Sequence, residues 1–283
     1  MRKIITSSER RGISGIIFSS AWPAFLSIVC AIIVFIVPSY QTGLTNWVCI
    51  RPINWLRLIA AMYLTSFAPG YCILRISKGE YLGCLSTFLI SYLLSLFFTS
   101  SLGFALLVSH LSIWKYSPLL LVSINLALAV LATLRFEKSQ NCVKTISRCI
   151  SFNLCDILVF LIAAGTVAGA IIINTSNSLF LFGVQNFYLN QAIAHSKDFP
   201  VGLQGNHAAN YDYWFFIYVA SFIRLSGFPI VNAYLSLLVF VGMPTLAFYE
   251  MTRRLTRSNI FGLIATIMMS FQGFGWIYAL YLK

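Results

Sequence analysis

Residues 117–135 read SPLLLVSINLALAVLATLR, a stretch in which only the final arginine is charged. The hydrocarbon core of a bilayer is about 30 Å thick, and a helix needs roughly 20 mainly apolar residues to cross it. A stretch of this length and composition predicts a transmembrane helix.

Seven more apolar windows of comparable length lie on both sides of it, at 14–38, 54–75, 81–107, 155–174, 210–226, 229–250 and 259–282. Over the 283 residues of the chain, 59% are hydrophobic and 9% are charged, which excludes an ordinary soluble protein. The alternating pattern of membrane-barrel strands is not visible in the sequence. We therefore predict an all-α fold, a polytopic membrane bundle of about eight transmembrane helices.

The basic residues set the predicted orientation. The formal net charge is +12, but these residues stand at the ends of the apolar windows and form no single patch, so no nucleic-acid partner is predicted. Because cytoplasmic segments are enriched in Lys and Arg, we place the N-terminus in the cytoplasm, which puts twelve of the 19 basic residues inside. The other seven are then outside: Arg51, Arg57, Lys115, Lys197, Arg253, Arg254 and Arg257.

The basic segment 136–153 divides the windows into two groups. We expect it to be a cytoplasmic linker between an amino-terminal four-helix region, 1–135, and a second membrane region, 154–283. Within the first region, Pro69-Gly70 predicts a kink or a helix end, because proline removes a backbone donor. Arg57 is expected to extend to the membrane interface, and Asp156 to cap the fifth helix, where the helix dipole favours a carboxylate.

Residues 175–214 form a long stretch that is neither apolar nor strongly basic, and the orientation places it outside. Its segment 184–197 has helical periodicity, with Tyr188 and His195 on one side, which predicts an amphipathic helix on the outer membrane surface between the fifth and sixth spans. A loop then returns to the sixth window at Asp212. Any functional site is expected in this stretch.

Two interpretations of its polar residues are open. In the functional interpretation, Asp198 or Asp212 acts as a general base or as a ligand of a divalent cation. In the structural interpretation, Asp212 ends a helix within an aromatic belt, and His195 and His207 are ordinary polar surface.

Three arginines precede the last window, at positions where the orientation predicts the outer face: Arg253, Arg254 and Arg257. Guanidinium groups suit a phosphate, through charge-assisted bidentate hydrogen bonds. That phosphate belongs either to a lipid-linked substrate or to a phospholipid headgroup of the surrounding membrane. Glu250 is placed to form an i,i+4 ion pair with Arg254.

Two quoted stretches carry a family resemblance. With the preceding span and outer loop, NYDYWFFIYVASFIRLSGFP (210–229) and FYEMTRRLTRSNIFGLIATI (248–267) resemble the amino-terminal part of integral-membrane glycosyltransferases of the GT-C superfamily, over about residues 155–283. The stretch LRLIAAMYLTSFAPGYCILRI (56–76) is similar to PGY-containing membrane segments that precede this module in large prokaryotic membrane proteins.

The resemblance implies transfer of a sugar from a polyprenyl-phosphate-linked donor at the outer face of a prokaryotic inner membrane. It also implies an acid at the start of the surface helix, where this chain has the amides Gln185 and Asn186. An amide can orient a hydroxyl or help to ligate a metal, but it cannot act as a general base. Asp212 or Asp198 would then replace the acid.

Around these acids, the resemblance implies a substrate-binding role for the surrounding polar residues, namely Gln185, Asn186, Tyr188, His195, His207, Tyr211, Arg253, Arg254 and Arg257. Family members usually continue with more spans, so a truncated or inactive member is included in the prediction. The alternative is a non-catalytic multi-pass membrane protein, either a transporter subunit or a scaffold in envelope polysaccharide assembly. A transporter is expected to show intramembrane charges or paired broken helices.

Overall fold

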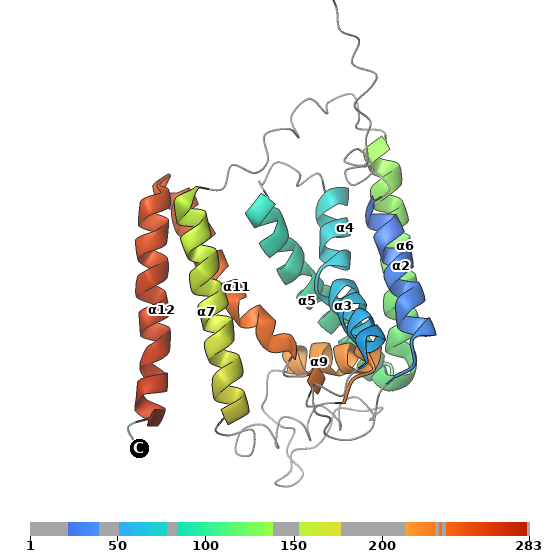
Figure 1. Cartoon of the computed structure of the whole chain (residues 1–283). Coiled ribbons are helices and arrows are strands. Elements are labelled where there is room, and N and C mark those ends of the chain that lie inside the picture. Colours follow the sequence, from blue (N-terminus) through green and yellow to red (C-terminus); the bar gives the residue numbers. More distant parts are fainter. Residues whose placement is uncertain are drawn as a thin grey trace, which may run out of the picture.

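The structure is a computed structural model, and it describes residues 22–39, 51–77, 84–137, 153–176, 213–229, 232–233 and 236–281. All secondary structure in these residues is helical, as predicted (Figure 1). The elements are α2 (Trp22–Ile36), α3 (Pro52–Ser66), α4 (Ala68–Ile76), α5 (Cys84–Val108), α6 (Ile113–Glu137), α7 (Leu154–Ser176), α9 (Tyr213–Ser226), the 3-10 helix η5 (Leu237–Gly242), α11 (Met243–Thr256) and α12 (Asn259–Tyr281).

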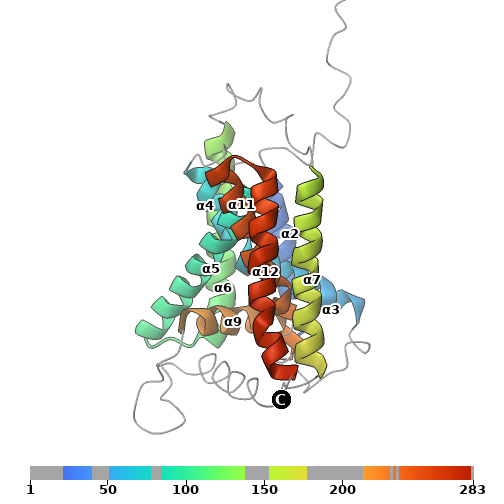
Figure 2. The ribbon, with the colours of Figure 1, turned by 90° about the vertical axis from the view of Figure 1, so that its left-hand side faces the viewer.

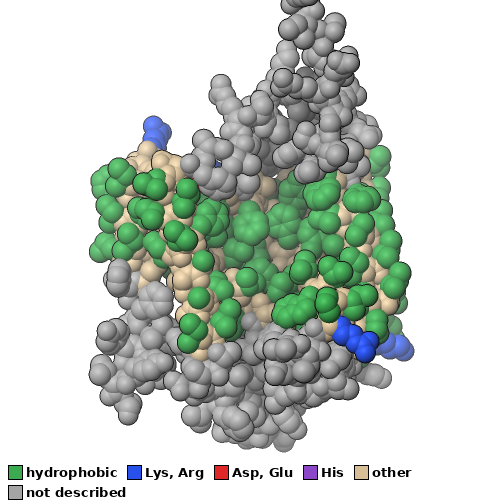
Figure 3. All heavy atoms as spheres, in the orientation of Figure 1, with side chains coloured by type: hydrophobic (Ala, Val, Ile, Leu, Met, Phe, Trp, Pro, Cys, Tyr) green, Lys and Arg blue, Asp and Glu red, His purple; other side chains and the backbone are tan. Residues whose placement is uncertain are grey.

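Among the described residues, four helical segments are long and apolar enough to cross a membrane: Pro52–Ile76, Leu85–Val108, Ile113–Arg135 and Leu154–Ile172. They correspond to the predicted windows 54–75, 81–107, 117–135 and 155–174. The segments Trp22–Ile36, Trp214–Ser226 and Asn259–Ser270 are shorter apolar helices. Seen from the side, the molecule carries a wide apolar band with Lys and Arg side chains at its edges (Figure 3). These features are those of a multi-pass membrane protein.

The helix ends gather at two opposite faces, which we call upper and lower after their positions in Figure 1. The upper face has the ends of α4, α6 and α11 and the starts of α5 and α7; there Arg135 Nη1 donates to the Ile76 carbonyl at 2.9 Å. The lower face has the starts of α3 and α6 and the ends of α5, α7 and α12; there Arg224 Nε donates to the Trp114 carbonyl at 2.9 Å.

Helix α9 corrects the prediction of a sixth span at 210–226. It has 14 residues, so it is about 21 Å long and too short to cross a core of about 30 Å. Both views show it lying crosswise along the lower face (Figures 1 and 2). Its residues from Phe216 to Phe222 are all buried, so this part of α9 is surrounded by other parts of the protein.

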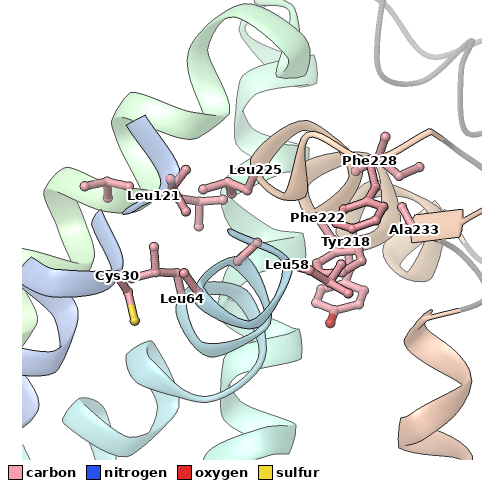
Figure 4. Close-up of a cluster of buried hydrophobic side chains, with 14 of the residues drawn as sticks. Cys30, Leu58, Leu64, Leu121, Tyr218, Phe222, Leu225, Phe228 and Ala233 are labelled. Atoms are coloured by element: carbon pink, nitrogen blue, oxygen red, sulfur yellow. The ribbon is translucent and has the colours of Figure 1, made fainter. Parts of the chain in front are cut away.

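The largest buried cluster is built around α9. Tyr218, Phe222 and Leu225 of α9 lie with Leu64 of α3 and Leu121 of α6 (Figure 4). The cluster therefore joins residues from both sides of the basic segment 136–153 in one core.

Arg57 fixes α9 to the helices beside it. The prediction that its side chain extends to the interface is wrong, since the residue is only 8% exposed. Its Nε donates to the Leu225 carbonyl at 3.0 Å and its Nη1 to the Val37 carbonyl. These carbonyls lie at the carboxyl-terminal ends of α9 and α2, where the helix dipoles favour a cation. Gly227, at φ +65°, leaves the space that the guanidinium occupies.

The predicted break at Pro69-Gly70 is confirmed, since α3 ends at Ser66 and α4 begins at Ala68. Pro69 has no N–H to donate to the Thr65 carbonyl, and Thr99 Oγ1 of α5 donates to it instead at 2.9 Å. Asn125 Nδ2 of α6 donates to the Leu64 carbonyl at 3.0 Å. Side chains thus satisfy the backbone groups that the break releases, as a membrane interior requires.

The seventh predicted window, 229–250, is discontinuous. The 3-10 helix η5 occupies Leu237–Gly242, and α11 begins at Met243 with Pro244 in its first turn. The helix type therefore changes at Met243-Pro244. From η5 the chain runs through α11 to the upper face, and α12 returns to the lower face (Figure 1).

Candidate functional site

Among the described residues, ion-paired side chains gather on the upper face where α7, α11 and α5 meet. Arg253 Nη1 lies 3.3 Å from Asp156 Oδ1, and Arg253 Nη2 pairs with Glu250. Arg254 Nε lies 2.8 Å from Glu250 Oε1, which confirms the predicted i,i+4 pair. Ser86 of α5 also donates to Glu250. The carboxylates thus join three helices through Arg253, Arg254 and Ser86.

The two carboxylate oxygens of Asp156 accept hydrogen bonds from three partners. Oδ2 accepts the backbone N–H of Asn153 at 3.0 Å, which is the capping role predicted for this residue. Oδ1 accepts from the Tyr249 hydroxyl at 2.6 Å as well as from Arg253. The Arg253 guanidinium lies over the Tyr249 ring, 5.4 Å from its centroid. Asp156 therefore caps α7 and also holds α7 against α11.

Glu250, at the upper-face end of α11, remains ionised at neutral pH. Burial alone would raise the pKa of this carboxyl group, but hydrogen bonds from Ser86 and Arg254 and the charges of Arg253 and Arg254 outweigh that effect. The pKa of Glu250 is therefore below its ordinary value. A carboxylate with these partners is a poor proton donor, so Glu250 is unsuited to general-acid catalysis. Its hydrogen bonds and ion pairs instead link α11 to α5.

The ion pair between Arg253 and Asp156 corrects the predicted topology. The prediction was that Asp156 lies at the inner face and the Arg253–Arg257 corner at the outer face, but the side chains of Asp156 and Arg253 are in contact. The reason is α9: because it does not cross, each later segment runs in the direction opposite to the one predicted. For the same reason Arg224, expected inside, lies at the lower face.

The corner arginines lie on the face opposite to the described helix ends that flank the polar stretch. Asp156 and Ser176 lie near opposite ends of α7, about 30 Å apart along the helix axis. Arg253, Arg254 and Arg257 lie at the Asp156 end, on the upper face. The end of α7 and the start of α9, which flank that stretch in the sequence, both lie at the lower face, opposite to these arginines.

The other predicted site residues lie outside the described residues: Gln185, Asn186, Tyr188, His195, Asp198, His207, Tyr211 and Asp212. The same holds for the predicted amphipathic helix at 184–197. Within the part of the chain that the structure describes, no group of His, Cys, Asp and Glu residues could hold a metal ion. Asp198 and Asp212, the residues predicted to ligate a divalent cation, lie outside that part of the chain.

Sequence reasoning did not identify the partnership of Asp156 with Tyr249 and Arg253, or that of Ser86 with Glu250. The partners are 93, 97 and 164 residues apart in the chain. A weak signal existed, because Glu250 and Asp156 are two of only seven acidic residues and each lies at the end of an apolar window. Scarce acids at helix ends are natural partners for arginines of the same face.

No protein-family model matches this chain, and neither a curated protein nor a solved structure is significantly similar to it.

Proposed function

We propose that this protein is a membrane glycosyltransferase of the GT-C type, which uses a polyprenyl-phosphate-linked sugar at the lower face. The observation that carries the proposal is the crosswise position of α9. Because α9 does not cross, residues 177–229 join the lower-face end of α7 to the segment that leads into α11. The resemblance implies this arrangement: a span, then a long segment that includes a helix lying along one face, then a further span.

The distribution of charge supports the outer face as the site of transfer. Thirteen of the 19 basic residues belong to the described upper face or to sequence segments that adjoin its helix ends. Six belong to the lower face or to its adjoining segments: Arg51, Arg57, Lys115, Lys197, Arg224 and Lys283. By the positive-inside rule the upper face is then cytoplasmic. The lower face becomes the outer face of a prokaryotic inner membrane, where polyprenyl-linked donors of the GT-C type would be used.

The proposed acids are Asp212 and Asp198. Asp212 directly precedes α9, and both belong to the segment between α7 and α9. Either carboxylate could act as the general base that the amides Gln185 and Asn186 cannot supply. Arg253, Arg254 and Arg257 are not part of this proposal, because they belong to the opposite face.

Sugar transfer by the purified full chain tests the proposal. The chain is incubated with a radiolabelled polyprenyl-phosphate sugar and an acceptor extract, and wild type is compared with Asp212→Asn and Asp198→Asn. Loss of a general base lowers the rate by roughly 100-fold or more, so one of the two variants should show that loss. Arg254→Gln, on the opposite face, is the matched control and should transfer normally. An inactive wild type contradicts the enzyme proposal.

A second candidate, a transporter subunit, is favoured by two discontinuous segments. One is the break between α3 and α4, and the other is the 3-10 segment Leu237–Gly242 before α11. Broken helices in corresponding halves of a chain are typical of transporters. Flux of a polyprenyl-linked sugar across vesicles, measured without an acceptor, separates this candidate from the first, since a glycosyltransferase produces no flux.

A further inference from the structure

The corner where α11 ends and α12 begins, residues 251–261, combines exposed arginines with exposed apolar side chains. Arg254 and Arg257 are exposed, and Arg257 ends α11 in the left-handed region at φ 55°. Between them Leu255 is 77% exposed, and Phe261 in the first turn of α12 is 61% exposed. A corner in water would not be expected to present apolar side chains of this size beside its charges.

The acids of the charged group lie beneath the arginines. Glu250 is 5% exposed, and Asp156 contacts Arg253 and Tyr249 at the inner side of the corner. The side chain of Arg254 is 48% exposed although its Nε is paired with Glu250. With Arg257, which makes no ion pair among the described residues, the corner has three arginines and two acids. It therefore has a surplus of positive charge, and two of its arginines, Arg254 and Arg257, are exposed.

We propose that this corner binds the headgroup phosphate of an anionic phospholipid. Arg254 and Arg257 would donate charge-assisted hydrogen bonds to the phosphate, while Leu255 and Phe261 lie among the upper acyl carbons. Apolar side chains at the level of the arginines select a lipid over a soluble anion, because a free phosphate leaves them in water. Exposed apolar residues continue along α12, with Ile264 and Met268, as expected for a helix that enters the bilayer directly below this corner. The proposal is independent of sugar transfer.

A lipid titration of the full chain tests the proposal. The protein in a neutral detergent is titrated with phosphatidylglycerol or with phosphatidylcholine, and the rise of its thermal unfolding midpoint gives an apparent Kd for each lipid by linkage. Wild type should bind phosphatidylglycerol more tightly than phosphatidylcholine. An arginine near an anionic surface contributes about a five-fold change in affinity, so Arg257→Gln should weaken phosphatidylglycerol binding about five-fold.

Two further variants sharpen the test. Arg254→Gln combined with Arg257→Gln should weaken phosphatidylglycerol binding about 25-fold if the two contributions add. Lys115→Gln, an exposed basic residue at the start of α6 on the lower face, is the matched control and should leave the Kd unchanged. Arg257→Gln removes no ion pair among the described residues, so its effect on folding should be small.

Three results would overturn the proposal. The first is an unchanged Kd in the double variant while the protein remains folded by circular dichroism. The second is an equal loss of affinity in Lys115→Gln, which would indicate a general charge effect. The third is equal stabilisation of wild type by glycerol 3-phosphate, which would show that the ligand is a soluble phosphate and that Leu255 and Phe261 play no part.

Discussion

The contact between Asp156 and Arg253 gives a quantitative prediction, because it ties the start of α7 to the end of α11. The perturbation is a double-mutant cycle of Asp156→Asn and Arg253→Gln. The charged atoms are 3.3 Å apart, and the side chains are 13% and 30% exposed. Exposed pairs contribute about 0.2–1 kcal/mol, and removing one partner of a buried pair costs about 3–5 kcal/mol. This half-buried pair should therefore couple by about 1–2 kcal/mol.

Asp156→Asn alone should cost more than this coupling, since it also weakens the cap of α7 at Asn153 by roughly 0.5–1 kcal/mol. The assay is unfolding in mixed micelles of increasing SDS content, followed by circular dichroism. Arg135→Gln is the matched control: its guanidinium donates to Ile76 elsewhere on the upper face, so its coupling with Asp156 should be near zero. A coupling below about 0.3 kcal/mol between Asp156 and Arg253, in variants that fold, would refute the reasoning and would fit the eight-span arrangement.

Three further predictions concern packing, the helix break and pH. Gly70→Ala places a methyl group 2.0 Å from the Ser91 carbonyl oxygen, so α4 must move away from α5 at a cost of about 1–3 kcal/mol. The matched control is Gly165→Ala, whose methyl group would have no atom within 4 Å and which should be neutral or stabilise by up to about 1 kcal/mol. Unfolding in SDS compares the two variants. Thr99→Val leaves the Thr65 carbonyl without its side-chain donor and should lower the free energy of unfolding by about 1–3 kcal/mol. The control Thr133→Val removes only a hydrogen bond to a carbonyl of its own helix and should change the midpoint of SDS unfolding little. Because the pKa of Glu250 in the folded protein is lowered, its carboxylate stabilises the fold above the ordinary pKa value of 4.5, and this contribution is lost as the pH falls through the folded pKa. Glu250→Gln should therefore reduce the loss of unfolding free energy between neutral and acidic pH. An unchanged pH dependence would contradict the prediction.

The sequence predicted the helices whose apolar windows have full membrane length, and it predicted the break at Pro69-Gly70. Both signals are local, since window length and the missing proline donor do not depend on the rest of the fold. The position of α9 could not be obtained in the same way. An apolar segment has the same composition whether lipid or protein surrounds it, although its 14 residues are typical of a buried or re-entrant helix.

That single helix explains the error in the predicted topology. Counting α9 as a span reversed the predicted side of every later residue, so Arg253, Arg254 and Arg257 were assigned to the face of the polar stretch. The partner that corrects this, Asp156, is 97 residues away from Arg253, and no local pattern connects them. Arg57 illustrates the same limit: its acceptors are carbonyls at Val37 and Leu225, which become neighbours only when α2, α3 and α9 assemble.

The claim that α9 does not cross the membrane is tested most directly by the sides on which two residues lie, Lys115 at the start of α6 and Thr256 at the end of α11. In a variant whose seven cysteines are replaced by serine or alanine, Thr256→Cys and Lys115→Cys are introduced one at a time. Each is then labelled in intact cells with a membrane-impermeant maleimide, before and after permeabilisation. Because α9 does not cross, we predict that Lys115→Cys is labelled in intact cells and Thr256→Cys only after permeabilisation. Labelling of both positions from the same side would contradict the claim that α9 does not cross the membrane.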